Sequence, residues 1–259
     1  MDNTNPIGLF DSGIGGTTIC KEVNLLLPNE NTIYLADSKN APYGQRSKAQ
    51  IIALSIKNMD YLLSRQCKLV IVACNTATTN AISELRVRYE LPIIGIEPAV
   101  KPATLLTKTA VIGVLATKGT LTSELFSNTV KKYSNIVIIE QIGYGLVKLI
   151  EEGKINHPDM DLLLQEYLTP MVEKGIDTLV LGCTHYPYLI AKIRKLIPAD
   201  ITIIDSGVAV AKHTQKVLTE KGLLNPTSHP GQHRFYTNKD IAVLQMFVDP
   251  PTAVEYLDF

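Results

Sequence analysis

The sequence lacks the features that mark several classes of protein. Its 25 basic and 25 acidic side chains cancel, so there is no overall excess of positive charge for binding nucleic acid. Its apolar runs are shorter than the roughly 18 residues of a membrane-spanning helix, and its polar first residues form no secretory signal. Four cysteines in 259 residues are too few for a disulfide framework. We therefore expect a cytoplasmic protein with free thiols, without nucleic acid or membrane partners.

What the sequence does contain is an apolar fraction of 46%, arranged in short runs separated by amphipathic stretches. The runs typical of strands are Ile7–Phe10, Thr32–Ala36, Leu69–Ala73, Ile93–Ile96, Ala110–Leu115, Ile136–Ile139, Leu179–Gly182, Ile201–Ile204 and Arg234–Tyr236. Helices are expected between them, including one from about Thr120 to Tyr133. Ser47 is expected to cap a helix, and Pro170 to bend or break another over Asp159–Lys174. These repeats predict an α/β protein with mostly parallel sheets and right-handed crossovers.

The alternation of strands and helices starts afresh after Glu97–Pro102. This restart predicts two similar α/β halves, with a return of the chain near Asp205. The pattern alone does not assign the segment after Asp205 to either half.

Two of the cysteines each follow a predicted buried strand. Cys74 comes after Leu69–Ala73, and Cys183 after Leu179–Gly182. Open α/β sheets bind ligands at this end of their strands. Each cysteine is also expected at a helix N-terminus, which favours the thiolate. A modest lowering from a pKa of about 8.5 would make either thiol a base near neutral pH.

Several functions of this cysteine pair compete. A disulfide is unfavourable in a reducing compartment, and a zinc site would need close ligand pairs such as Cys-x-x-Cys. A phosphatase Cys-x5-Arg loop is excluded, because Asn80 and Leu189 stand at the sixth positions. A hydrolase with one nucleophile would leave the second cysteine without a role. Two thiols across a small anionic substrate could instead remove a proton from one face of a carbon and return one to the other.

The remaining cysteines and the first glycine-rich loop carry weaker signals. Cys20 and Cys67 lack polar neighbours, which predicts core packing. Asp11–Gly16 is not a dinucleotide loop, because Thr18 stands where the third glycine is needed. A tight turn with Asp11 or Ser12 as a helix cap and a loop around a small ligand both stay open.

Four segments share a pattern with a known family. They read GLFDSGIGG at 8–16, PYG at 42–44, ACNTA at 73–77 and GCTHYP at 182–187. In this order, and with Asp205–Ala211, they resemble the glutamate racemases of the cofactor-independent aspartate/glutamate racemase family.

The resemblance implies both a fold and an activity. It implies two flavodoxin-like domains, residues 1–97 with 206–259 on the Cys74 side and residues 98–205 on the Cys183 side. The active site would lie in the cleft between them, with glutamate as the small-molecule substrate. The activity would interconvert L- and D-glutamate without a cofactor and supply D-glutamate for peptidoglycan. A cytoplasmic homodimer is also implied, although the variable hinge at Glu97–Ala103 leaves dimer geometry and regulation open.

The resemblance also implies a role for each matched residue. Cys74 would be the base toward D-glutamate and Cys183 the base toward L-glutamate, each acting as acid in the other direction. Asp11 and His185 would assist the neighbouring thiols. The implied substrate contacts are Asp11, Ser12, Tyr43, Gly44, Asn75, Thr76, Thr117, Thr120, Thr184 and His185. No metal is implied.

The sequence departs from the family at one loop and leaves alternatives open. Glu140–Gly145 replaces an Ala-Cys-Pro segment common in the family, so only Glu140 is a candidate neighbour of the substrate amino group. A racemase for aspartate or another amino acid is the first alternative. A non-catalytic amino-acid-binding protein is the second. Pyridoxal phosphate is disfavoured because Lys39 and Lys118 lie in nearby loops rather than at a strand tip.

Overall fold

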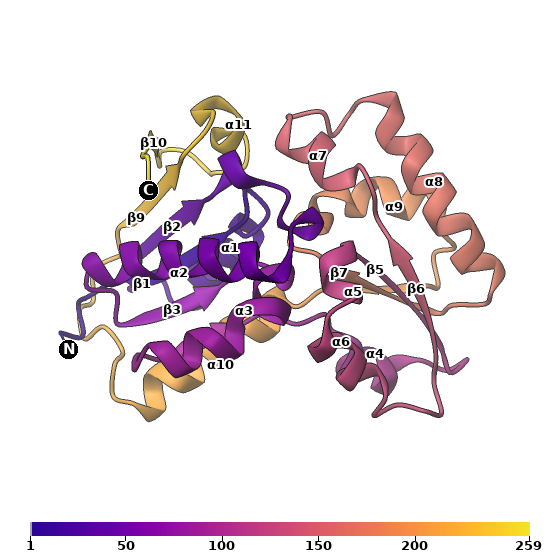
Figure 1. Ribbon diagram of the computed structural model, residues 1–259, viewed down its shortest axis with the longest axis horizontal. Helices are drawn as coiled ribbons and strands as arrows, with labels where there is room; N and C mark the ends of the chain where they lie inside the picture. The colour runs from indigo at the N-terminus through magenta and orange to yellow at the C-terminus, as the bar shows by residue number, and fades with distance from the viewer. Residues whose placement is uncertain (1) are drawn as a thin grey trace.

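The computed structural model describes residues 2–259 and contains two separate parallel sheets (Figure 1). The first has the strand order β10-β9-β2-β1-β3-β4, and the second has the order β6-β5-β7-β8. The first sheet consists of β1 (Ile7–Asp11), β2 (Thr32–Ala36), β3 (Leu69–Val72), β4 (Ile93–Gly95), β9 (His233–Thr237) and β10 (Val254–Tyr256). The second consists of β5 (Val111–Ala116), β6 (Val137–Ile142), β7 (Thr178–Gly182) and β8 (Thr202–Ile204). The predicted α/β class with parallel sheets is confirmed.

Helices cover both faces of each sheet. Those around the first sheet are α1 (Thr17–Leu26), α2 (Lys48–Ser64), α3 (Asn75–Arg88), α10 (Gly207–Glu220) and α11 (Ile241–Gln245). Those around the second are α4 (Val100–Leu106), α5 (Lys118–Leu121), α6 (Glu124–Val130), α7 (Leu146–Glu151), α8 (Pro158–Glu173) and α9 (Ile190–Leu196). Short 3₁₀ turns are η1 (Ser38–Asn40), η2 (Tyr43–Gln45) and η3 (Tyr186–Leu189). No helix in residues 2–259 has the length and apolar character that crossing a membrane requires.

Strand β3 illustrates why the central strands read as continuous apolar runs. Its four residues are all buried. Ile71 packs in the cluster that contains residues of α1 and α10, whereas Val70 and Val72 pack in the cluster that contains residues of α2 and α3. Successive side chains of a strand point to opposite faces, so a strand covered on both faces needs apolar residues throughout.

The two sheets share one topological feature that positions the site. In the first sheet, β1 lies between β2 and β3, and in the second, β5 lies between β6 and β7. The order of strands therefore reverses beside β1 and beside β5, and ligands bind in the crevice at such points. The register places Phe10 beside Val72 and Ala116 beside Gly182. Cys74, which follows β3, and Cys183, which follows β7, thus lie at switch points.

Several local predictions are wrong, each for a physical reason. The helix expected from Thr120 to Tyr133 is two helices, because Ser123 accepts a hydrogen bond from the Phe126 N–H and starts α6 anew. Helix α4 lies where only a boundary was expected, with Val100 and Ala103 buried.

Other differences lie near element ends. Pro170 does not break α8, which continues through it to Glu173. Strand β10 was not predicted. In contrast, Ser47 caps α2 as predicted, in a capping box with Gln50. The structure places the strands before residue 97 and after residue 205 in the same sheet, while the two predicted domain boundaries stay a prediction.

Candidate active site

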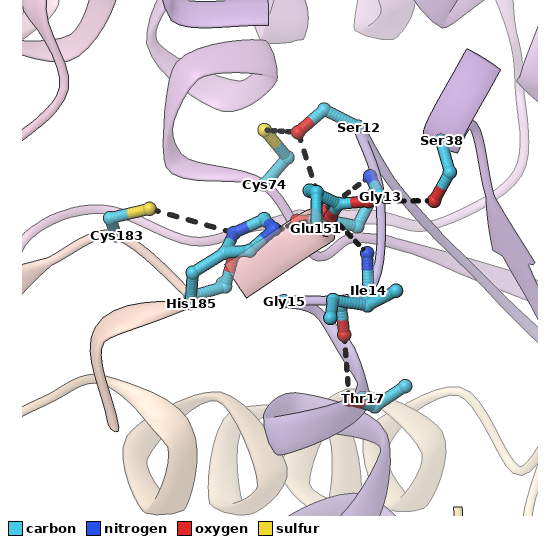
Figure 2. A network of polar contacts seen from close by, with 12 residues as sticks. Ser12, Gly13, Ile14, Gly15, Thr17, Ser38, Cys74, Glu151, Cys183 and His185 are labelled. Atoms are coloured by element: carbon cyan, nitrogen blue, oxygen red, sulfur yellow. Dashed lines mark hydrogen bonds and ion pairs between the residues drawn. The ribbon is translucent and has the colours of Figure 1, made fainter. Parts of the chain in front are cut away.

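Cys74 lies at the N-cap of α3, where β3 ends. Its Sγ accepts a hydrogen bond from the Ala77 N–H at 3.4 Å and lies 3.7 Å from Ser12 Oγ. Ser12 in turn donates to Asp11 Oδ1 at 3.4 Å. Figure 2 shows the contact between Cys74 and Ser12. The Ser12 hydroxyl therefore connects the Cys74 thiol to the carboxylate of Asp11, which belongs to the neighbouring strand β1.

The pKa of Cys74 is not lowered, in contrast to the prediction. Burial raises the pKa of this thiol well above its ordinary value, and the nearby Asp11 carboxylate raises it further. The Ala77 N–H at the start of α3 lowers it, but by less. The sequence reveals the helix N-terminus but not the burial, whose cost to a thiolate is larger.

Cys183 has a different neighbour. Its Sγ lies 3.7 Å from His185 Nδ1, and His185 Nε2 lies 2.6 Å from Glu151 Oε1 (Figure 2). Burial lowers the pKa of His185, but its contacts with Cys183 and Glu151 outweigh burial and raise it well above its ordinary value. These contacts favour an imidazolium beside Cys183.

The predicted helix N-terminus at Cys183 is absent. A bend follows the cysteine, and the next element is the 3₁₀ turn η3, which begins at Tyr186. Helix α9 begins only at Ile190. Pro187 is the second residue of η3, and this 3₁₀ turn separates the cysteine from the helix. The chain instead folds His185 back toward the cysteine two residues before it.

Glu151 is the site residue that sequence reasoning missed. It is the last residue of α7, is 6% exposed, and accepts hydrogen bonds from the Ile14 N–H at 2.6 Å and Ser38 Oγ at 2.9 Å. A signal was available, because Glu151 shares the buried face of α7 with Val147 and Ile150. A carboxylate on such a face needs partners, and here they come from the opposite half of the chain.

The loop at Asp11–Gly16 is built for close approach to this network. Asp11 Oδ1 accepts from the Gly13 N–H at 2.8 Å, and Oδ2 accepts from Thr184 Oγ1 at 2.9 Å. A Cβ on Gly13 would lie 1.9 Å from Glu151 Oε1, and one on Gly15 would lie 2.2 Å from His185 Nδ1. Only glycine fits there. Asp11 both closes a turn and holds a residue of the second half.

Asp11 is fully buried, and burial raises its pKa to about 6. His185, the Gly13 N–H and Thr184 oppose that shift, and Glu151 adds to it. A carboxyl group with this pKa changes charge close to neutral pH, next to the Ser12 hydroxyl that contacts Cys74.

A small pocket collects most of the predicted site residues. It is lined by Ser12, Pro42, Tyr43, Gly44, Cys74, Asn75, Thr76, Thr117, Val147, Cys183, Thr184 and His185. Ten of the twelve predicted residues are among them, while Asp11 and Thr120 lie behind its wall. Pro42 and Val147 line it without having been predicted. The two thiols, which come from different sheets, therefore share one pocket.

The polar groups around the pocket are unequally engaged. Thr117 Oγ1 lies 2.8 Å from Thr76 Oγ1 and 3.1 Å from Thr120 Oγ1, so a hydroxyl cluster joins the two halves. The Tyr43 hydroxyl instead donates to Asp37 Oδ2 at 2.5 Å, and the Asn75 amide donates to the Ile96 carbonyl at 3.5 Å. Tyr43 and Asn75 therefore need no ligand to satisfy these groups.

Three further candidates lie outside this pocket. Glu140 is on β6, which extends beyond its predicted end, and its side chain is exposed. It is not a pocket residue. Lys39 pairs with Asp258 at 3.6 Å, and Lys118 lies in an adjoining depression. Within residues 2–259, no three His, Cys, Asp or Glu side chains gather closely enough to hold a metal ion.

The fold and the site define a two-sheet α/β protein that places a thiol from each sheet, with a proton-exchanging partner for each, around one pocket. A model of the family "Asp/Glu/Hydantoin racemase" matches residues 15–214, and the chain belongs to this family. It is accordingly a racemase, an enzyme of the isomerase class.

Relatives agree along nearly the whole chain. The chain is 44% identical over 248 residues to the glutamate racemase of Cupriavidus pinatubonensis, which covers 95% of this chain and 91% of the relative. A crystal structure of a Bacillus anthracis glutamate racemase isoform is similar with a TM-score of 0.89 and 29% identity, covering 99% and 98% of the two chains. The glutamate racemase of Francisella tularensis in complex with D-glutamate gives 0.85 and 32%, with the same coverage.

Proposed function

We propose that this protein is a glutamate racemase that moves a proton on and off the two faces of the α-carbon with Cys74 and Cys183. The observation that carries the proposal is that these two thiols, from separate sheets, line one small pocket. The names of its close relatives support glutamate as the substrate. The proposal includes a cytoplasmic homodimer that needs no cofactor and supplies D-glutamate for peptidoglycan.

The reaction requires one thiolate and one thiol at a time. With D-glutamate bound, the Cys74 thiolate takes the α-proton, and the Cys183 thiol gives a proton to the opposite face, which yields L-glutamate. In the reverse direction Cys183 is the base and Cys74 the acid. Each turnover exchanges the protonation states of the two sulfur atoms.

Forming the Cys74 thiolate is the costly step in the empty pocket, because burial and Asp11 both raise the pKa of this thiol. The ammonium group of the substrate supplies a positive charge inside the pocket. An opposite charge within a few ångströms favours the ionised thiol. Substrate binding would therefore lower the pKa of Cys74 at the time the thiolate is needed, while Ser12 and Asp11 offer a path for its proton.

Two bases do not by themselves explain a useful rate, because an α-proton of an amino acid is far less acidic than a thiol. The pocket must stabilise the carbanion by fixed hydrogen-bond donors from which water is excluded. The hydroxyls of Thr76 and Thr117 are candidates, since they lie at the pocket wall, whereas the single proton of the Thr184 hydroxyl is already donated to Asp11. His185, held as an imidazolium by Glu151, is the cationic candidate.

The experiment is an assay of the purified protein with L-glutamate beside L-aspartate, in D2O and without added cofactor. We expect the optical rotation to be lost with L-glutamate and to stay unchanged with L-aspartate. Each product molecule should carry one solvent deuterium at its α-carbon. Inversion without deuterium would contradict the two-base mechanism. Turnover of aspartate instead would reassign the substrate, and glutamate binding without any turnover would indicate a binding protein. An absorbance spectrum of the protein as purified checks for a bound aldimine.

A further inference from the structure

A shallow depression lies directly outside the catalytic pocket. The two share the lining residues Pro42, Gly44, Thr117 and Val147. Both halves of the chain contribute to the depression, through η2, the start of α5, and the loop from β6 to α7. It adjoins the pocket along these four residues, and we refer to it as the mouth.

The mouth carries positive charge and no carboxylate. Its charged lining residues are Lys118 and Lys148, both exposed. The uncharged lining residues are Pro42, Gly44, Gln45, Thr117, Ile142, Gly143, Tyr144, Gly145 and Val147. In a protein whose basic and acidic side chains are equal in number, two lysines without a carboxylate beside one opening form a local excess of positive charge.

The charges of these lysines are largely uncompensated. Lys118 makes no ion pair with any other of residues 2–259. Lys148 Nζ lies 3.9 Å from Glu152, but Glu152 is closer to Lys154, at 2.8 Å. Lys154 is not a lining residue of the mouth, so the positive charge of Lys148 is only partly offset.

The pocket itself is closed in this structure, with no more room than about one water molecule needs. A substrate must therefore first meet the outside of the pocket, where the mouth is the depression that adjoins it. Near neutral pH, glutamate has two carboxylates and one ammonium group, and hence a net negative charge. We propose that the mouth is an outer anion subsite, where Lys118 and Lys148 hold a carboxylate of the incoming amino acid before the pocket admits it. This inference rests on the proposed racemase function.

The expected size of the effect follows from Coulomb attraction in water. One lysine at about 7 Å from a carboxylate raises its local concentration about threefold, and two raise it about sevenfold. The lysines act before the pocket closes around the substrate. Their removal should therefore lower kcat/KM and leave kcat nearly unchanged.

The test compares Lys118→Gln/Lys148→Gln with the wild type and with Lys131→Gln/Lys174→Gln. The control removes the same charge from two exposed lysines that lie outside the mouth. Initial rates with glutamate are measured at about 20 mM and about 500 mM salt. We expect kcat/KM to be up to about sevenfold lower for the mouth variant at low salt, and a wild-type value for the control. At high salt the difference should nearly disappear, since the screening length falls to about 4 Å.

Three results would overturn the inference. These are an unchanged kcat/KM in the mouth variant, an equal loss in the control, or a loss in kcat alone, which would indicate a role in the chemistry. If the wild type does not turn over glutamate, the proposed function fails separately. Association rate constants of D-glutamate at the two salt concentrations then decide the matter, because a site that acts before the pocket closes changes the rate of binding rather than the final affinity. A mouth variant that associates as fast as the wild type, or a wild type that does not bind, contradicts the subsite.

Discussion

The two thiols occupy corresponding places in two sheets with the same central strand order, yet their surroundings differ. Cys74 contacts a serine hydroxyl that leads to the buried carboxyl group of Asp11. Cys183 contacts an imidazole that is held by Glu151. Similar folds thus place the sulfur atoms alike, and loop residues give each a different proton partner. This suits a substrate whose two faces present different groups to the two sides.

The largest effect should come from removing either thiol. We expect Cys74→Ser and Cys183→Ser each to lower kcat about 10²- to 10⁴-fold, because a serine hydroxyl is too weak an acid to replace a general acid–base thiol. The measurement is racemisation of both enantiomers, with circular dichroism as a check on folding. Cys67→Ala is the control, since Cys67 packs in the core. Normal turnover in the Cys74 variant would contradict a role for Cys74 as base or acid.

Glu151→Gln should affect the Cys183 side specifically. Because Glu151 raises the pKa of His185, its loss should lower that pKa and move the alkaline limb of the kcat/KM profile to lower pH. We expect kcat to fall about 10- to 100-fold, as for a weakened charge-assisted hydrogen bond in a catalytic unit. Profiles of the variant and of the exposed control Glu173→Gln provide the measurement. An unshifted limb with reduced kcat would indicate a purely structural role.

Asp11→Asn should change how the free energy of unfolding depends on pH, because Asp11 is the buried carboxyl group on the Cys74 side of the site. The folded-state pKa of Asp11 is raised to about 6 from 3.8. Its contribution to stability is therefore full below pH 3.8 and is lost as the pH rises through about 6. The full difference is on the order of 3 kcal/mol, and roughly half of it falls between pH 5 and pH 8. Urea unfolding across this range should show that the free energy of unfolding falls with rising pH in the wild type more than in the variant. A constant difference would contradict the buried titration.

The strands and the pocket were largely predictable from sequence. Buried central strands such as Leu69–Val72 are apolar throughout, and cysteines at their ends had to lie at a sheet edge. The four family segments supplied ten residues that line the pocket. Capping chemistry likewise identified Ser47 as the start of α2.

What the sequence did not reveal depends on contacts between distant segments. Glu151 joins the site because α7 carries it against the Ile14 N–H and Ser38, a pairing that no local pattern specifies. The raised pKa of Cys74 depends on burial by both halves and on Asp11. Strand β10 exists because β9 offers it an edge, with Val254 beside Phe235. These features follow from tertiary packing rather than from propensity.

The strand order of the first sheet has a consequence for synthesis of the chain. Its last two strands, β9 and β10, come from residues 233–256, after the whole second sheet of residues 111–204. On a ribosome, which releases the N-terminal part first, the second sheet can be completed while β2 still has an open edge awaiting β9. The Cys183 side of the site can thus form before the first sheet that carries Cys74 is complete. A newly made chain would therefore complete the sheet that carries Cys74 only near the end of translation.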